Sequence, residues 1–254
     1  MKLLAYSFSF SAALFLGLAA PVRGGVSQQV VSASADTFGR SDQDGAGSTP
    51  NGTSKTIIAG ELVTNKDLHI YFEFTLPALP DGAVIESVSL NLSLASGNDG
   101  SATGSVFSLY ALTESFDEAT ANWASRSYSS TSPSDTIAWT TPGGTVTTPA
   151  LATTTITSNT IQTWSSAGLV DQVKSAYTSD SGSGSVVRLM LAAPDANNST
   201  RKIATFDSRE ATNAPQLVIT YSLSSVPEPA TCALLAGAAI LGLAAVRRLR
   251  CRVV

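Results

Sequence analysis

The chain has 254 residues, with 15 Lys or Arg against 19 Asp or Glu and a net charge of −4 at neutral pH. An acidic chain with scattered basic residues argues against nucleic acid as a partner, because phosphate contacts reward clustered positive charge. It has one histidine, His69, and no Gly-x-Ser-x-Gly, phosphate-loop or His/Cys zinc spacing, so we expect no enzyme.

The first 24 residues are typical of a secretory signal peptide. Lys2 precedes a mostly apolar stretch, Leu3–Ala20, and small residues near Gly24 suit cleavage. We expect a signal helix that the Sec and signal-peptidase machinery recognises and removes, with an exported domain over residues 25–224. Because Cys232 and Cys251 both lie beyond this domain, it has no disulfide and must be stabilised by its buried core.

Alternating apolar and polar residues dominate the exported domain and predict half-buried strands. One predicted face carries Leu68, Ile70, Phe72, Phe74 and Leu76, and the next strand has a face with Val84, Val88, Leu90, Leu92 and Leu94. Further strands are predicted at Ser105–Thr113, Val186–Ala192, Ile203–Asp207 and Gln216–Leu223, with weaker patterns at Val30–Phe38, Thr56–Ala59 and Leu151–Thr157.

One segment, Ser165–Ser179, repeats apolar residues every three or four positions. It predicts a short amphipathic helix across an edge or end of the sheets. Long loops rich in Ser, Thr, Gly, Asn and Asp are expected at Gly39–Lys55, Ser96–Gly104 and Arg126–Thr136. Strands joined by such loops favour an all-β fold, namely a jelly-roll-like antiparallel β-sandwich with one short helix.

Residues 225–254 form a separate C-terminal segment. Val226-Pro227-Glu228-Pro229 precedes an uncharged apolar run, Ala230–Val246, and four arginines follow at 247, 248, 250 and 252. As a helix this run would extend roughly 25 Å, just short of the ~30 Å hydrocarbon core, so we expect a C-terminal transmembrane helix. The arginines would hold the C-terminus in the cytoplasm and leave everything before Val226 outside.

These three parts, in this order, resemble a PEP-CTERM sorting tail. The resemblance implies that Pro227, Glu228, Pro229, Arg247 and Arg248 belong to a sorting motif read by exosortase, a transpeptidase-like membrane enzyme of Gram-negative bacteria that make extracellular polysaccharide. The protein would then pass transiently through the inner membrane to the cell surface or the extracellular matrix. An ordinary C-terminal membrane anchor is the alternative interpretation.

The middle of the chain resembles the DNRLRE-type domain, which is related to carbohydrate-binding modules of bacterial surface proteins. The resemblance is carried, in order, by Ala35–Phe38, Ile70–Phe74, Leu79–Leu92, Phe116–Trp123, Trp164–Tyr177, Phe206–Glu210 and Pro215–Tyr221. It implies a jelly roll that binds polysaccharide or acts as a structural surface module. Relatives often have arginine where this chain has Asp67 and His69. At these positions the chain therefore departs from the basic ligand site that the resemblance implies.

Aromatic side chains and one arginine are the candidate ligand-binding residues. Trp139 and Tyr128 are candidates for stacking on sugar rings. Of the three tryptophans, Trp139 is the candidate for exposure because a Pro-Gly-Gly turn follows it, and burial in the core is the alternative. Trp123 and Trp164 are expected in the core. Arg209 is expected to form an ion pair with Glu210 or, alternatively, to bind an acidic sugar.

Three further polar residues have structural interpretations. Asp117 and Glu118 are neighbours on an extended chain and so face opposite ways, which disfavours a pair converging on a glycosidic bond. We expect them to hold the loop before Trp123 instead. His69 is expected on the polar face of its strand, as a surface histidine.

No cofactor is expected apart from structural calcium. Asp42 and Asp44 with Asn51, or Asn98 with Asp99, offer the oxygen ligands that calcium prefers, although their spacing does not match an EF-hand loop.

Two functions are compatible with these features. The first is an exported, exosortase-sorted protein whose β-sandwich binds polysaccharide without catalysis. The second is a structural surface or biofilm protein with no specific ligand, which the Ser/Thr-rich loops favour.

Overall fold

The computed structural model describes residues 25–42, 50–62, 66–179, 184–193 and 200–223, and in the C-terminal segment residues 237, 238, 240–242 and 247. The chain divides into a compact unit of residues 25–224 and a second unit made of its two ends. The expected signal helix, the residues 227–229 and 248 of the sorting motif, and Asp44 lie outside the described residues.

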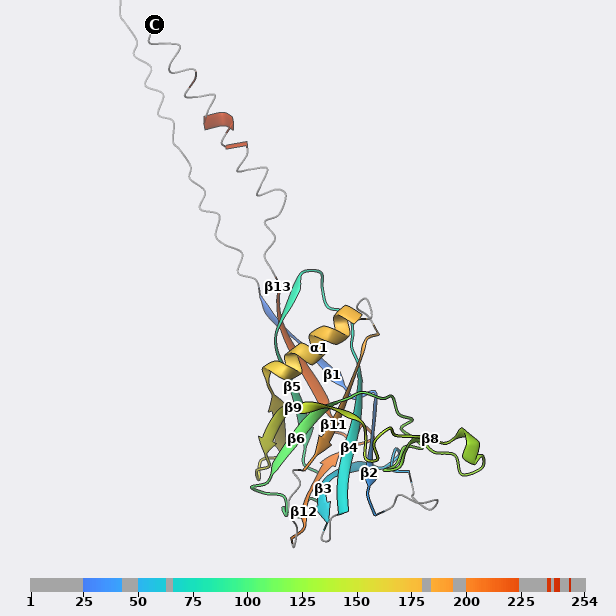
Figure 1. Ribbon diagram of the computed structural model, residues 1–254. Coiled ribbons are helices and arrows are strands. Elements are labelled where there is room, and N and C mark those ends of the chain that lie inside the picture. The colour runs from blue at the N-terminus through green and yellow to red at the C-terminus, as the bar shows by residue number, and fades with distance from the viewer. Residues whose placement is uncertain are drawn as a thin grey trace, which may run out of the picture. The chain divides into compact units, whose positions relative to one another are not determined.

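The regular secondary structure of the compact unit is almost entirely β-strand (Figure 1). Its strands are β1 (Val26–Ser32), β2 (Ala35–Arg40), β3 (Thr56–Leu62), β4 (Lys66–Thr75), β5 (Ala83–Ser93), β6 (Val106–Leu112), β7 (Ser125–Ser127), β8 (Ile137–Ala138), β9 (Val146–Thr155), β10 (Ile161–Ser165), β11 (Val186–Ala192), β12 (Lys202–Asp207) and β13 (Gln216–Leu223). The helix α1 spans Ala167–Ser179, and Pro133–Asp135 form a single 3-10 turn.

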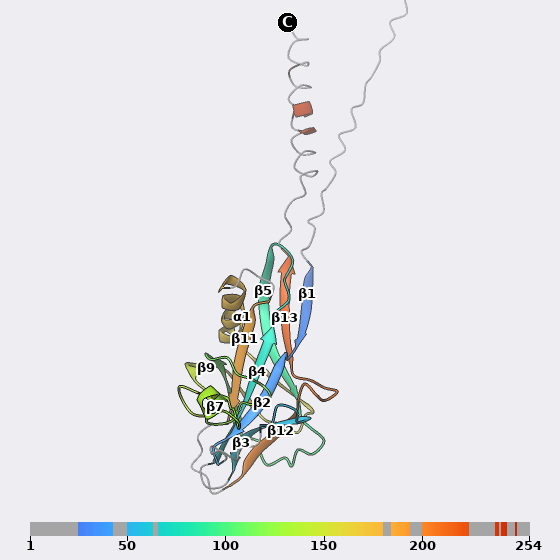
Figure 2. The same ribbon diagram turned by 90° about the vertical axis from the view of Figure 1, so that its right-hand side faces the viewer.

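The strands form two larger sheets in which each neighbouring pair is antiparallel. The smaller sheet has the order β1-β13-β5-β10, three strands of which lie side by side at the top of Figure 2. The larger sheet has the order β12-β3-β4-β11-β6-β9, with β2 also paired to β4. The short strands β7 and β8 pair only with each other among the described strands. The expectation of an antiparallel all-β sandwich with one short helix is confirmed.

Apolar side chains from both sheets fill the space between them. The largest fully buried ones include Trp164, Phe72, Phe74, Phe107 and Phe206. Trp164 Nε1 donates a hydrogen bond of 3.0 Å to the Phe107 carbonyl, which satisfies the one polar group of this buried ring. Its expected place in the core is therefore confirmed.

Helix α1 contributes to the same core. It buries Leu169 and Val173 and packs against β5, β9 and β11. Ser166 Oγ accepts a hydrogen bond of 3.0 Å from the Leu169 N–H, which caps a donor in the first turn of the helix.

Two strand predictions differ from the structure for identifiable reasons. The segment Val30–Phe38, predicted as one strand, belongs to two strands, because the chain crosses from one sheet to the other at Ala33 and Ser34. The Ala33 N–H donates to the Pro215 carbonyl and the Ser34 N–H to the Glu73 carbonyl. Val84 is 47% exposed while its neighbour Ile85 is buried, because the pairing of β13 with β5 shifts register between Thr220 and Tyr221. Such an irregularity reverses the face on which each following side chain lies.

The outer face of the larger sheet is covered over parts of β4, β6 and β11. Residues 114–145, here called the covering segment, lie between β6 and β9 and include β7 and β8. A second buried cluster forms beneath them from Tyr71, Leu112, Trp139, Met190 and Ala192. The amphipathic pattern of β4 did not predict this second layer.

His69, which was expected on the polar face of its strand as a surface histidine, has close contacts with the covering segment. His69 is half-buried, its ring lies 4.6 Å from the ring of Trp123 between centroids, and its Nδ1 is 2.7 Å from the Gly143 carbonyl oxygen. The covering segment thus encloses the one histidine of the chain.

No helix among the described residues is long and apolar enough to cross a membrane. The run expected to do so, Ala230–Val246, lies largely outside those residues.

Candidate functional site

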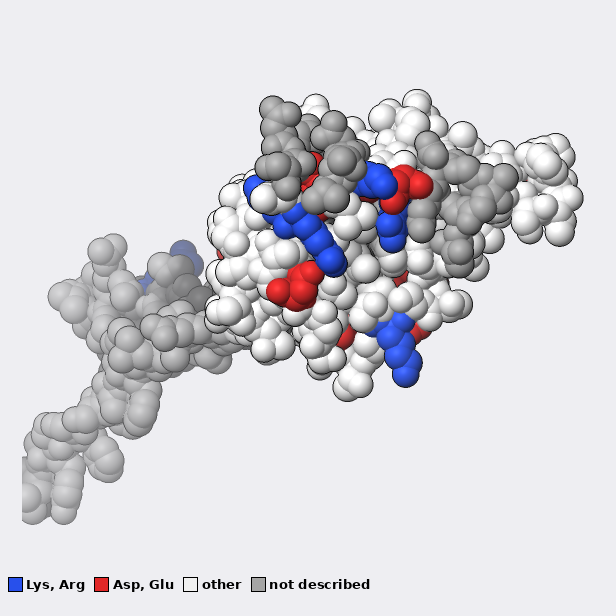
Figure 3. Space-filling model, turned by 90° about the horizontal axis from the view of Figure 1, so that it is seen from below, with Lys and Arg blue, Asp and Glu red and all other residues white. Residues whose placement is uncertain are grey.

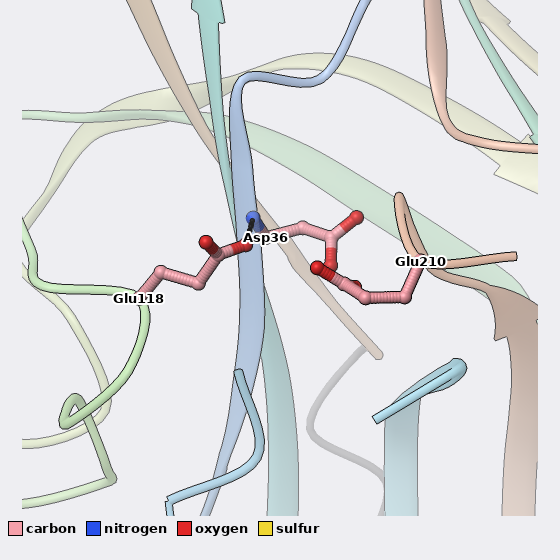
Figure 4. Close-up of side chains that lie close together, drawn as sticks. All are labelled: Asp36, Glu118 and Glu210. Carbon is pink, nitrogen blue, oxygen red and sulfur yellow. Dashed lines mark hydrogen bonds between the residues drawn. The ribbon is translucent and has the colours of Figure 1, made fainter. Parts of the chain in front are cut away.

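Four charged residues from three separate segments meet at one place on the sandwich. Asp36 is the second residue of β2, Glu118 lies in the covering segment, and Arg209 and Glu210 lie in the turn that follows β12. Figure 4 shows the three carboxylates of this group converging. We call these four residues the charge cluster.

Local hydrogen bonds fix each segment of the charge cluster. Glu118 belongs to a turn in which the Thr120 and Ala121 N–H groups both donate to the Asp117 carbonyl. The turn at Arg209 closes with a hydrogen bond from the Ala211 N–H to the Ser208 carbonyl. Gly52 is required beside Glu118, because a Cβ at this position would collide with the Glu118 backbone.

The segments also bind one another directly. The Asp36 N–H donates to Glu118 Oε1 at 2.8 Å, and the Arg209 N–H donates to Asp36 Oδ2 at 2.8 Å. The Arg209 guanidinium forms two parallel bonds to Glu118, from Nε to Oε1 at 2.5 Å and from Nη2 to Oε2 at 2.6 Å. Arg209 Nε also lies 3.1 Å from Glu210 Oε1.

The charge cluster places negative charge where little water can reach it. One oxygen from each of Asp36, Glu118 and Glu210 lies within 4.8 Å of the other two, and Asp36 is only 1% exposed. Burial is the largest cause that raises the pKa of Asp36 to about 7. The nearby charges of Glu210 and Glu118 act in the same direction, and the hydrogen bond from the Arg209 N–H acts against them. Asp36 Oδ1 has no hydrogen-bond partner.

An open groove of about 770 Å³ lies beside the charge cluster and shares Glu210 with it. It is lined by Lys55, Thr56, Leu94, Ala95, Ser96, Gly97, Asn98, Ser158, Thr160, Asp207, Glu210, Ala211, Thr212 and Asn213. Apart from Leu94, these side chains are small, polar or charged, and none of them is aromatic. The groove can therefore offer hydrogen bonds and charges but no ring for stacking.

Charges of both signs lie close together on the face of the molecule seen from below in Figure 3. Two ion pairs of the compact unit illustrate this mixing, Arg40 with Asp42 at 3.0 Å and Arg201 with Asp99 at 3.1 Å.

The structure does not bring the three candidate ligand residues together at an exposed site. Trp139 is 4% exposed, so its interpretation as an exposed ring is wrong and the alternative of burial is confirmed. Tyr128 is half-buried in the covering segment, where its N–H is 3.3 Å from Thr120 Oγ1. The expected ion pair of Arg209 with Glu210 is present, and Glu118 adds a second, bidentate partner that was not predicted.

The other tryptophan and the Asp117-Glu118 pair can also be placed. Trp123 is half-buried against His69 rather than fully buried in the core. Asp117 Oδ1 accepts a hydrogen bond of 3.0 Å from the Ala119 N–H, and Glu118 binds Arg209. The expected structural role of these two carboxylates, in the turn that precedes Trp123, is therefore confirmed.

Several candidate calcium ligands among the described residues have protein partners in the structure. Asp42 binds the Arg40 guanidinium at 3.0 and 3.1 Å and lies 3.5 Å from Lys66 Nζ. Hydrogen bonding to Arg40 holds the pKa of Asp42 below its usual value, despite some burial. Asn98 Oδ1 accepts a hydrogen bond from Thr205 N–H. A calcium site in these loops stays a prediction.

Asp36 is the functional candidate that the sequence interpretation overlooked. It lies within a strand whose neighbours Thr37 and Phe38 are buried, so a carboxylate at this position is unusual. The sequence shows only an Asp two residues before Phe38 in a predicted strand, and the partners of Asp36 lie 82 and 173 residues further along the chain.

Comparison with known families identifies the C-terminal segment. The family described as the PEP-CTERM protein-sorting motif matches residues 225–248, which include Pro227, Glu228, Pro229, Arg247 and Arg248. The predicted sorting motif is thus confirmed, and it is the signal of an exported protein that exosortase sorts to the cell envelope. No curated protein matches the chain. The resemblance of the sandwich to the DNRLRE-type domain stays a prediction.

Proposed function

We propose that this protein is an exosortase substrate that displays a non-catalytic, jelly-roll-like β-sandwich of the DNRLRE type, and that the sandwich binds polysaccharide at the cell surface or in the extracellular matrix. The observation that carries the proposal is the PEP-CTERM motif at the end of a chain whose exported part is an all-β sandwich. Its processing partners are the Sec and signal-peptidase machinery and exosortase, and its membrane contact is the C-terminal segment.

The polar groove beside the charge cluster is the surface best suited to a sugar. Asn213 and Lys55 are exposed, and the Asn213 side-chain amide already donates to Asp207 Oδ2 at 3.0 Å. Amide and carboxylate groups held together in this way can donate to and accept from the hydroxyls of one sugar unit. Recognition would rest on hydrogen bonds, because Trp139 is buried and the groove has no aromatic lining.

The geometry of the charge cluster supports a binding module rather than a glycosidase. Hydrolysis of a glycosidic bond needs two carboxyl groups that both reach the substrate. Asp36 is 1% exposed and Glu118 is held by two bonds from Arg209, so these two carboxyl groups serve the fold.

Binding of polysaccharide by the purified exported protein tests the proposal. We expect retardation in affinity gels that contain matrix polysaccharide of the producing cells, and weaker retardation of Asp207→Ala and Asn213→Ala variants. Thr163→Ala, on the exposed side of β10, is the matched control. Equal mobility with and without neutral or acidic polymers would contradict polysaccharide binding.

A structural surface protein without a specific ligand is the second candidate. The observation in its favour is that Trp139 and Arg209, two of the three residues expected to contact sugar, are engaged by Asn122 and Glu118 within the protein. This function predicts that the exported protein shows no polymer affinity while loss of the protein weakens the cohesion of the biofilm. Clear affinity of an unglycosylated protein for sugar would exclude it.

A further inference from the structure

We propose that Asp36, Glu118 and Glu210 form a binding site for one calcium ion, and that Arg209 supplies the positive charge that occupies this place in the cation-free protein. The inference concerns the stability of the sandwich and does not depend on whether the groove binds polysaccharide.

The spacing of the three carboxylates fits a shared ion. One oxygen from each residue lies within 4.8 Å of the other two. Calcium binds oxygen at about 2.3–2.6 Å, so two of its ligands can lie up to about 5 Å apart on opposite sides of the ion. The three oxygens can therefore contact a single cation without rearrangement of the strands that carry them.

An unsatisfied buried oxygen points to a missing partner at this place. Asp36 is 1% exposed, its Oδ2 accepts from the Arg209 N–H, and its Oδ1 has no hydrogen-bond donor. Figure 4 shows the Asp36 carboxylate turned toward Glu210, whose own oxygens are acceptors only. A buried carboxylate is costly unless a cation or hydrogen-bond donors compensate it, and a cation between Asp36 and Glu210 would do so.

The charges and atom types select the ion. When all three carboxyl groups are ionised, as cation binding requires, they and the one guanidinium carry a net charge of −2, which one divalent cation neutralises. All ligand atoms are carboxylate oxygens, which suit calcium or magnesium and not the metals that prefer Cys or His. Calcium is favoured because it accepts irregular oxygen geometry, whereas magnesium demands a near-ideal octahedron.

Arg209 can give up its place to the ion. Its guanidinium bridges Glu118 and Glu210, with Nε 2.5 Å from Glu118 Oε1 and 3.1 Å from Glu210 Oε1. Its side chain is 39% exposed, so it can turn into solvent while its backbone N–H keeps the bond to Asp36. The ion would then join β2, the covering segment and the β12–β13 turn more firmly than one arginine does.

Calorimetric titration of calcium chloride into the chelator-treated, full-length protein tests the site, with thermal unfolding as the second measurement. We expect one ion per chain and a melting temperature that rises with calcium concentration. Glu210→Gln should weaken the affinity by about tenfold or more, because it removes a ligand charge. Asp36→Asn should abolish binding, and Glu210→Gln keeps the test valid if Asp36→Asn does not fold.

Two further variants separate this site from other interpretations. Asp42→Asn is the matched control, since Asp42 belongs to a different acidic group held by Arg40 and Lys66, and it should bind calcium like the wild type. Arg209→Met should bind at least as tightly as the wild type, because it removes the competing positive charge.

The proposal is overturned by any of three results. One is the absence of both heat and a thermal shift at about 10 mM calcium, roughly ten times the weakest affinity of extracellular calcium sites. Another is loss of binding in Asp42→Asn but not in Glu210→Gln. The third is loss of binding in Arg209→Met. That result would mean that Arg209 stays paired with the carboxylates and that Asp36 is neutralised by a proton instead of a calcium ion. Because no polysaccharide is present, these results are independent of the proposed glycan binding.

Discussion

Trp139 carries a large part of the second core beneath the covering segment. Its ring lies 4.9 Å from the ring of Tyr71 between centroids, and its Nε1 donates a bond of 2.8 Å to the Asn122 carbonyl. We expect Trp139→Ala to lower the free energy of unfolding by about 3–5 kcal/mol, as for other buried aromatic side chains. Trp139→Phe should cost less, because it keeps an aromatic ring beside Tyr71.

Denaturant unfolding of both variants checks this prediction, with Tyr128→Ala as the comparison at a half-buried position of the same segment. A Trp139→Ala protein of unchanged stability that had lost affinity for polysaccharide would contradict the buried role and restore the exposed one.

Trp139 also shows what a sequence can say about a single residue. A tryptophan before a Pro-Gly-Gly turn is compatible with either an exposed ring or a buried one. The deciding contact is with Tyr71, which lies in a strand 68 positions earlier along the chain, and no local pattern encodes it. By contrast, the ion pair of Arg209 with Glu210 joins adjacent residues and was predictable.

Glu114 makes the start of the covering segment sensitive to acid. Burial of this carboxyl raises its pKa, but hydrogen bonds from Thr145 and Thr140 outweigh that and hold the pKa below its usual value. A lowered folded-state pKa contributes stability above the unfolded-state value of 4.5 that is lost as the pH falls through the folded-state value.

We therefore expect the covering segment to loosen below about pH 4.5, with a loss no larger than about 1 kcal/mol because Glu114 is partly exposed. Hydrogen exchange of residues 114–145 as a function of pH measures this loss. Glu114→Gln should remove the dependence on pH in this range. The same acid response in the variant would show that another group causes it.

At the scale of elements, periodicity predicted the strands that face a single core. The alternating segments became β4, β5, β6, β11, β12 and β13, and the segment with a helical period became α1. β10 was missed because it has five residues, only two of which are buried. Within the covering segment, the sequence predicts a loop at Arg126–Thr136 because Ser and Thr dominate it. The role of the segment depends on distant residues of β4 and β11.

The turn at Gly143 attaches the covering segment to the sheet. Gly143 has a φ of +86°, and a Cβ there would lie 2.7 Å from the Trp123 ring. Gly104 has a similar φ of +83° but nothing within 4 Å of the same position. Alanine at Gly104 therefore adds only backbone strain, on the order of 1 kcal/mol, whereas alanine at Gly143 adds a clash.

We expect Gly143→Ala to lower the denaturation midpoint more than Gly104→Ala does, and to increase hydrogen exchange within residues 114–145. Since both variants carry the same backbone strain, the difference between them reports the contact with Trp123. Equal midpoints and equal exchange would mean that the turn does not hold the segment down.

At the scale of the whole molecule, the charge cluster depends on the fold having formed. Its bonds join residues separated by 82, 91 and 173 positions. Period-two patterns predict which segments are strands and which face of each strand is buried. They do not predict which loops come together in the folded sandwich. For this reason the residues of the cluster could be found in the sequence one by one, while their meeting could not.

The sorting motif at residues 225–248 is the signal of an exported protein, and its role can be tested directly. Under the proposed function, exosortase recognises Pro227, Glu228 and Pro229 on the outer side of the inner membrane, while the arginines keep the C-terminus inside. Replacing all three motif residues by alanine should leave export intact but prevent processing. The protein should then accumulate in the envelope fraction at the mass of the unprocessed form.

Fractionation of producing cells with intact-mass measurement compares this variant with Arg247→Ala/Arg248→Ala and with Thr163→Ala in the sandwich. The double arginine variant should also fail to be processed, since fewer positive charges retain its C-terminus in the cytoplasm. The Thr163→Ala protein should match the wild type in mass and location. If the triple alanine variant also matched the wild type, residues 227–229 would not direct sorting, and the C-terminal segment would act as a plain membrane anchor.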